Sequence, residues 1–263
     1  MSFHPKWHAV VLAAGRGPDD PMAKAFGIAH KCALAVAGVP MLQRVLTALA
    51  AAGMARPILV SIDDADQGRS AAGPLADKTR MIAAAASAPA SAKAAVMATG
   101  SYPVLVTTGD HALLTAEMVA EFCAQAMASG ADFCVGLATA ETILAAYPDT
   151  KRTFFRLGPD RVSGCNLFAV NSPKGLALFD TWSAIEQNRK KPWKLVAAFG
   201  FGPLFSFLAG RLTLRKAFAE ASRRIGISIV PVLLPFAEAA IDVDKPEDHA
   251  LAERIIRLRN DQG

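Results

Sequence analysis

Glycines, an arginine and a lysine gather near the start of the chain in a pattern that could bind phosphate groups. Residues 10–17 read VVLAAGRG, an apolar run that ends in small residues. Backbone N–H groups in such a stretch can approach a triphosphate because no Cβ atom obstructs them. Arg16 and, further on, Lys31 carry positive charge that would neutralise the phosphates. Taken alone, such a stretch is more often an ordinary glycine turn after a strand.

A second stretch places one aspartate where a divalent cation could be held. Residues 104–115 read VLVTTGDHALLT, so an apolar run delivers Asp110 to its carboxyl end. Magnesium is held by one or two carboxylates together with phosphate oxygens and waters. Asp110 is therefore a candidate ligand, and we expect His111 to shape the loop rather than to bind metal.

A third stretch, near the end of the chain, carries four acidic residues. Residues 240–248 read AIDVDKPED. Glu247 and Asp248 suit the first turn of a helix, which favours negative charge. Asp242 and Asp244 precede that helix and would point the same way in an extended backbone. Helix capping therefore does not explain why acidic residues stand at these two positions.

The pattern along the chain alternates between buried strands and amphipathic helices, and it predicts a mostly parallel sheet covered on both faces. Ligands bind beyond the carboxyl ends of the strands in such sheets, where the glycine stretch and Asp110 would meet. We expect loops at 15–30 and directly after 62, strands at 8–14, 57–62, 103–108, 131–138, 161–170 and 227–233, and helices at 40–53, 89–98, 115–129, 173–188, 193–208, 213–224 and 246–259.

A further run, KCALAVAGVPML at 31–42, completes a longer pattern. Together with the three stretches above, it resembles the signature of the MobA-like nucleotidyltransferase superfamily. That signature consists of LAAGxGxR, KxLLPVxGxPML, VLVxxGDxPLLT and DVDTPEDL, and the four parts occur here in the same order. The resemblance is strong up to residue 138 and again at 240–252, and it is thin between 139 and 235.

The chain departs from the family pattern at two places. Residues 18–20 read PDD, where the family has an arginine two places after the second glycine, and the loop to the lysine is longer than usual. Arg16 or Lys24 could take the role of the missing arginine. Ala112 stands in place of a proline in the metal motif, which leaves Asp110 itself unchanged.

The resemblance implies a Rossmann-like α/β fold, a three-layer sandwich with a mostly parallel mixed sheet and a helical insertion in the C-terminal half. We expect a single domain over 1–263, with a helical segment at 172–225 on the acceptor or partner side. The implied reaction transfers an NMP from an NTP to a phosphorylated acceptor, releases pyrophosphate and uses Mg²⁺. The implied site comprises Lys31, Asp110 and Asp244 as catalytic residues; Asp110 and Asp244, with Asp242 as second choice, as metal ligands; Leu12, Ala13, Ala14, Gly15, Arg16, Gly17, Lys31 and Ser91 as nucleotide-binding residues; and Gly164 and Asn166 as acceptor-binding residues.

The identity of the substrates and two other functions stay open at this point. We expect CTP or GTP as the nucleotide, and a cofactor precursor (molybdopterin- or cobinamide-like), a sugar phosphate or a phosphorylated lipid headgroup precursor as the acceptor. The altered loop after Gly17 would suit an inactive paralogue that binds nucleotide as a sensor or subunit. A glycosyltransferase would need an Asp-x-Asp after a middle strand, and the match at 242–244 comes too late in the chain.

Residues 188–236 resemble the family least, and within them 188–224 interleave basic and apolar residues. The apolar run is about 14 residues long, roughly 21 Å as a helix, which is too short for a bilayer core of about 30 Å. We expect a packed helical pair at a sheet edge or a contact between copies in a homo-oligomer. The alternative is peripheral association with a membrane that holds the acceptor.

Charge, cysteine spacing and the N-terminal sequence indicate which partners and which compartment to expect. The formal charge of +5 would attract polyanions such as nucleotides, or an anionic membrane surface. We expect no nucleic-acid partner, because no basic-aromatic motif occurs. The four cysteines lack CxxC or Cys/His spacing, which favours free thiols in a reducing compartment over zinc. The N-terminal stretch lacks a signal-peptide pattern, so we expect a cytoplasmic protein, with peripheral membrane association left open.

Overall fold

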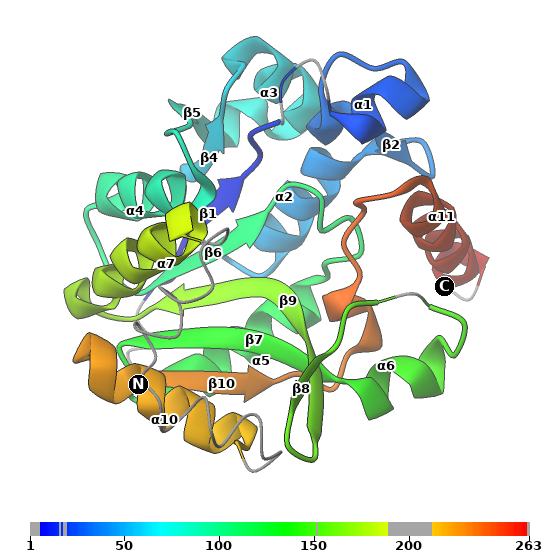
Figure 1. Ribbon diagram of the computed structural model, residues 1–263. Coiled ribbons are helices and arrows are strands. Elements are labelled where there is room, and N and C mark those ends of the chain that lie inside the picture. The colour runs from blue at the N-terminus through cyan, green and yellow to red at the C-terminus, as the bar shows by residue number, and fades with distance from the viewer. Residues whose placement is uncertain (1–5, 16, 18–19, 151, 189–211, 262–263) are drawn as a thin grey trace, which may run out of the picture.

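Eight strands form one sheet in the described part of this computed structural model, which comprises residues 6–15, 17, 20–150, 152–188 and 212–261 (Figure 1). The strand order is β10-β7-β9-β6-β1-β4-β5, and β8 pairs with β9. Neighbours on this path are parallel, except that β9 runs antiparallel to both β6 and β7. The strands are β1 (His8–Leu12), β4 (Ile58–Ile62), β5 (Thr79–Ala83), β6 (Val104–Thr108), β7 (Phe133–Thr139), β8 (Phe155–Leu157), β9 (Asp160–Val170) and β10 (Ile229–Leu233).

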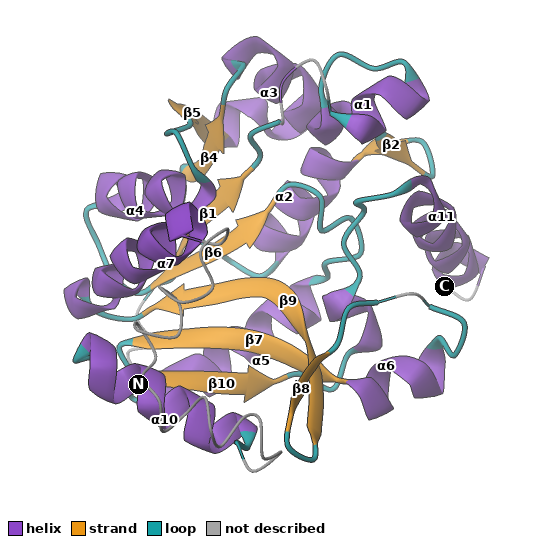
Figure 2. Ribbon diagram, in the orientation of Figure 1, coloured by secondary structure: helices purple, strands orange, loops and turns teal. Residues whose placement is uncertain are grey.

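Helices cover both faces of the sheet, as Figure 2 shows. The α-helices in the described ranges are α1 (Pro21–Phe26), α2 (Met41–Ala51), α3 (Ala65–Ala72), α4 (Ala88–Thr99), α5 (Ala116–Ala128), α6 (Ala140–Ala146), α7 (Ala177–Asn188), α10 (Leu214–Ile225) and α11 (Pro246–Asp261). Short 3₁₀ helices are η2 (Lys31–Ala33), η3 (Gly73–Lys78), η4 (Pro173–Leu176) and η5 (Ala237–Ala240), and β2 (Ala35–Val36) pairs with β3 (Val39–Pro40) in a separate hairpin.

Alternation along the central strand distributes its side chains between two cores. Ala9 and Val11 of β1 pack in a cluster with α2, α3 and α5, whereas Val10 packs in a cluster with α4 and α7. All three residues are fully buried. Successive side chains of a strand point to opposite faces, so a continuous apolar run is what a sheet covered on both sides requires. The prediction of a three-layer α/β fold with a mostly parallel mixed sheet is confirmed.

Several elements fall where the sequence predicted loops. Helix α1 lies within the expected loop 15–30, and the polar stretch after residue 62 contains α3 and the edge strand β5. Strand β5 has no fully buried residue, so it lacks the buried apolar run that marks the strands predicted from the sequence. Helix α3 has a side-chain cap, because Asp64 accepts hydrogen bonds from the N–H groups of Asp66 and Gln67. The short elements α6, β8 and η5 were also not predicted.

Part of the C-terminal half lies outside the described residues. This applies to the predicted helix at 193–208 and to most of the basic and apolar segment 188–224, from which α10 alone is described in full. None of the helices in the described ranges combines the length and hydrophobicity that a bilayer crossing requires.

Candidate active site

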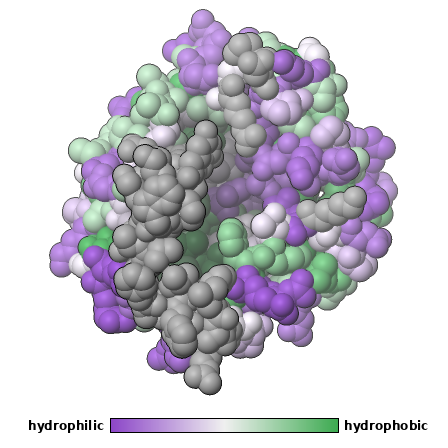
Figure 3. All heavy atoms as spheres, in the orientation of Figure 1, coloured by the Kyte–Doolittle hydropathy of each residue, from purple (hydrophilic) through white to green (hydrophobic). Residues whose placement is uncertain are grey.

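A cavity of about 760 Å³ lies beyond the carboxyl ends of β1, β4 and β6. In the space-filling view the molecule is hollowed near the centre of the face shown, and hydrophilic residues border the hollow (Figure 3). The lining residues are Leu12, Ala13, Ala14, Gly15, Asp20, Lys31, Cys32, Met41, Ser61, Ala85, Ala86, Ser87, Ala88, Ser91, Thr108, Gly109, Asp110, Asn166, Phe168, Trp182 and Asp244.

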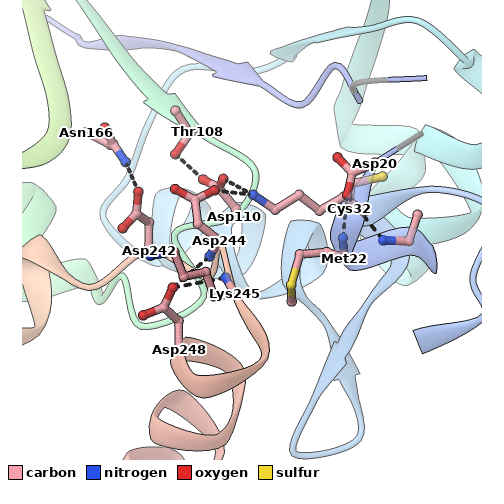
Figure 4. A network of polar contacts seen from close by, with 12 residues as sticks. Asp20, Met22, Cys32, Thr108, Asp110, Asn166, Asp242, Asp244, Lys245 and Asp248 are labelled. Atoms are coloured by element: carbon pink, nitrogen blue, oxygen red, sulfur yellow. Dashed lines mark hydrogen bonds and ion pairs between the residues drawn. The ribbon is translucent and has the colours of Figure 1, made fainter. Parts of the chain in front are cut away.

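The side chain of Lys31 lies between two carboxylates at this cavity. Its Nζ is 2.6 Å from Oδ2 of Asp110 and 2.7 Å from Oδ1 of Asp244. The carboxylates of these two aspartates turn toward the same point from different loops (Figure 4). Burial alone would lower the pKa of Lys31, but the charges and hydrogen bonds of the two aspartates raise it above its usual value. The lysine is therefore a fixed positive charge.

Hydrogen bonds in the backbone bring the two aspartates together. The N–H of Val243 donates to the carbonyl oxygen of Asp110 at 3.1 Å, which joins the C-terminal segment to the end of β6. Val243 is fully buried, and Asp244 therefore faces the other way, into the cavity. The hydroxyl of Thr108 donates to Oδ1 of Asp110 at 2.6 Å, which leaves Oδ2 for Lys31.

Asp63 and His30 hold the turn that carries Lys31 against the glycine loop. His30 is buried, and its Nδ1 accepts the N–H of Cys32 at the start of η2. Because Nδ1 is an acceptor, Nε2 carries the proton and donates to Asp63 Oδ1 at 2.9 Å. The N–H of Gly15 donates to the same oxygen at 3.0 Å. Burial would raise the pKa of Asp63, but these two donors hold it below its usual value.

The ends of β1 and β6 approach closely where Gly109 follows β6. A Cβ atom at Gly109 would lie 3.0 Å from the Cβ of Ala13, which is tighter than nine in ten real Cβ contacts. The N–H of Gly109 donates to the carbonyl oxygen of Leu12 at 2.8 Å. Glycine thus allows the close approach of the glycine loop and the Asp110 loop.

A family model for the MobA-like NTP transferase domain matches residues 9–157, which is more than half of the chain. The chain belongs to this family. It is accordingly a nucleotidyltransferase, and the matched range covers the glycine loop, Lys31 and Asp110. No curated protein matches the sequence of this MobA-like transferase.

Solved structures share the fold of the MobA-like transferase over almost its whole length. A hypothetical transferase from Thermus thermophilus is 27% identical with a TM-score of 0.77, over 93% of this chain and 100% of that one. A CMP:2-keto-3-deoxy-manno-octonic acid synthetase in complex with CTP is 15% identical with a TM-score of 0.57, over 97% and 100%. The 4-diphosphocytidyl-2C-methyl-D-erythritol synthase from Anaerococcus prevotii is 13% identical with a TM-score of 0.55, over 96% of each chain.

Most of the site residues predicted for this MobA-like transferase meet at the cavity. Those that line it are Leu12, Ala13, Ala14, Gly15, Lys31, Ser91, Asp110, Asn166 and Asp244. Among the described residues predicted, Gly17, Gly164 and Asp242 are not in the lining, and Arg16 lies outside the described residues.

Local contacts refine three of these predictions. The N–H of Gly15, expected to face a triphosphate, donates to Asp63 instead. The hydroxyl of Ser91 accepts the N–H of Ala85 at 2.9 Å and so fixes the loop before α4. Both carboxylate oxygens of Asp242 are engaged by other side chains, one of them that of Asn166.

Sequence reasoning missed His30, Asp63 and Arg152. Asp63 directly follows β4, and ligands generally bind at the carboxyl ends of strands in such sheets, so this position was a usable signal. His30 directly precedes the lysine of the family motif. Arg152 falls in the stretch where the family resemblance is thin, and no pattern in the sequence marks it.

Proposed function

We propose that the chain transfers the nucleoside monophosphate of an NTP to a phosphorylated small molecule, with Mg²⁺ held by Asp110 and Asp244. The observation that carries this proposal is the shared position of Lys31 Nζ, 2.6 and 2.7 Å from the two carboxylates in the cavity. The ammonium group of Lys31 is thus held there by two carboxylates from separate parts of the chain. CTP or GTP is the nucleotide we propose.

The residues present fit a magnesium ion. The described residues contain no group of three or more His, Cys, Asp or Glu side chains that could hold a metal, so the protein would supply two carboxylates and the nucleotide its phosphate oxygens. Asp110 and Asp244 can both reach one positive centre, as their contacts with Lys31 show. When bound, Mg²⁺ would neutralise the triphosphate and polarise the α-phosphoryl group.

In the proposed reaction, a phosphate oxygen of the acceptor attacks the α-phosphorus in line. The new bond joins that oxygen to the α-phosphorus, the bond from the α-phosphorus to the bridging oxygen breaks, and pyrophosphate leaves with that electron pair. Lys31 stabilises the charge that builds up on the α-phosphoryl oxygens. The residues act by positioning and charge neutralisation rather than by forming a covalent intermediate.

Pyrophosphate release tests the proposal directly. The full chain is incubated with Mg²⁺, each of the four NTPs and pools of cofactor precursors, sugar phosphates and phosphorylated lipid headgroup precursors. We expect release with one NTP and one pool. Nucleotide binding without release under every condition would instead support an inactive nucleotide-binding protein.

Two variants then test the residues. Asp110→Ala should abolish release while circular dichroism shows an unchanged fold. Lys31→Ala should lower kcat by about 10²–10³-fold and raise KM much less, because its charge acts mainly in the transition state. Asp66→Asn is the matched control, since this carboxylate is 94% exposed on α3. Full turnover by Asp110→Ala would remove that residue from the mechanism.

A further inference from the structure

Two side chains from distant parts of the sequence enclose the carboxylate of Asp242. Arg152 donates from Nη2 to Oδ1 of Asp242 and from Nη1 to its carbonyl oxygen, the latter at 3.3 Å. Asn166 donates from Nδ2 to Oδ2 of Asp242 at 3.0 Å, and Figure 4 shows the side chains of Asn166 and Asp242 facing each other. The side chains of Asp242 and Arg152 are only 17% and 12% exposed.

Asp244 has a different environment although it lies only two residues away. Its carboxylate is 43% exposed and contacts Lys31 in the cavity. Ile241 and Val243 are both fully buried, so Asp242 and Asp244 emerge on the same side of an extended backbone. Two free carboxylates at this spacing would compete for one cation. The enclosure of Asp242 removes that competition.

Arg152 also contacts the carboxylate that fixes the backbone of Asp244. Its Nη1 lies 3.7 Å from Oδ1 of Asp248. The other oxygen of Asp248 accepts the N–H groups of Asp244 and Lys245 at 3.2 and 3.0 Å. A single guanidinium therefore reaches the carboxylates of both Asp242 and Asp248.

Asn166 reaches Asp242 because β9 is irregular at this point. Its φ angle is +49°, in the left-handed region, where asparagine is tolerated better than most residues. The pairing of β9 with β7 shifts register across this region. Asn166 also lines the cavity, so the strand beside the proposed acceptor is joined to the metal-binding segment.

From these contacts, and resting on the proposed function, we propose that Arg152 and Asn166 are positioning residues. They hold Asp242 away from the cation, so that Asp244 is the ligand that this segment presents opposite Asp110. Removal of Arg152 alone leaves a buried carboxylate without its partner, which is far more damaging than removal of both members of the pair. The released Asp242 would turn toward the cation and displace Asp244.

Binding of Mn²⁺ measures this directly, because water-proton relaxation separates bound from free ion. Wild type, Asp244→Asn, Asp242→Asn, Arg152→Met and the double variant Arg152→Met/Asp242→Asn are titrated with Mn²⁺ in the presence of CTP and of GTP. We expect Asp244→Asn and Arg152→Met to weaken Mn²⁺ binding about tenfold or more, and Asp242→Asn to change it less than about threefold. The double variant should return to within about threefold of Asp242→Asn, and kcat should follow the same order.

Controls separate positioning from general stability. Arg223→Met removes an arginine that is 76% exposed on α10, so Mn²⁺ binding should stay as in wild type. If thermal melting shows that Arg152→Met is unfolded, Arg152→Lys replaces it, and its smaller loss should likewise be rescued by Asp242→Asn.

Three results would overturn the inference. The first is a loss of Mn²⁺ in Asp242→Asn as large as in Asp244→Asn, which would make Asp242 a ligand. The second is a double variant as impaired as Arg152→Met. The third is a lowered Tm in the arginine variants with unchanged Mn²⁺ affinity. In each of these cases the wild-type protein still releases pyrophosphate, so the proposed function stands. If wild type neither binds Mn²⁺ in the presence of nucleotide nor releases pyrophosphate, the proposed function is rejected as well.

Discussion

The thiol of Cys32 lies in the cavity wall, directly after Lys31 in the chain. Its side chain is buried, and burial, with a contribution from the charge of Asp63, raises the pKa of this thiol to about 12. Burial also raises the pKa of Cys123 and of Cys165 to about 12. Because the thiolate is the nucleophile, these cysteines are structural rather than reactive.

The native enzyme should therefore resist thiol reagents. At pH 8 we expect labelling by dithionitrobenzoate to be at least about a hundredfold slower than for a free thiol, since a pKa near 12 leaves very little thiolate. In guanidinium chloride all four thiols should react at once. Rapid labelling of one thiol in the native state would show that the cavity wall opens at Cys32 or that another cysteine is accessible.

The site residues that the sequence predicted are those whose chemistry requires a particular residue type in a fixed motif. Lys31, Asp110 and Asp244 were found in this way, and the fold brings them together. Arg152 and Asp63 act through other protein groups, and the sequence does not reveal which partners the chain will bring to them. Arg152 is 90 residues from its partner Asp242, and Asp63 is 33 residues from its partner His30.

Among the elements, the junction of β1 and β6 depends on one residue without a side chain. Gly109→Ala would place a Cβ atom 3.0 Å from that of Ala13 and push the two loops apart. We expect a loss of about 1–3 kcal/mol in the free energy of unfolding, as for other overpacked sites, together with reduced kcat.

Gly164→Ala is the matched control for stability. A Cβ atom there meets nothing within 4 Å, and the backbone is not in the left-handed region. Its free energy of unfolding should stay within about 0.5 kcal/mol of wild type. Urea denaturation of both variants checks this, and equal stability would mean that the junction of β1 and β6 is not tightly packed.

Elements with a clear apolar period were predicted well, and weakly apolar ones were not. Helix α2 buries residues at helical spacing, and α5 begins at the predicted cap Thr115. Strand β5 is half-exposed at the sheet edge, and α3 is mostly polar, so neither has the burial pattern on which such predictions depend. The antiparallel direction of β9 depends on pairing with β6 and β7, which local sequence does not encode.

On the scale of the whole molecule, the site exists only when both ends of the chain have folded together. Lys31 and Asp244 are 213 residues apart, and Asp110 comes from a third region. Strand β6 carries Asp110 to its carboxyl end, the segment between β1 and α2 brings Lys31 to the same place, and the segment before α11 returns there with Asp244. The proposed catalytic site therefore depends on long-range packing rather than on any single motif.

In the enzyme without ligands, the positive charge of Lys31 balances the negative charge of Asp110 and Asp244. The ammonium group of Lys31 lies between the two carboxylates, so a divalent ion that binds without nucleotide must displace it. A bound triphosphate can instead attract the lysine side chain and so free the carboxylates for the metal ion. Nucleotide should thus strengthen Mn²⁺ binding by about 5–150-fold in wild type, and Mn²⁺ must strengthen nucleotide binding equally. Lys31→Met should bind Mn²⁺ without nucleotide more tightly than wild type does, as calorimetry can test. Equal Mn²⁺ affinities of wild type and Lys31→Met would mean that displacing the lysine costs no binding free energy, and that metal and nucleotide bind independently.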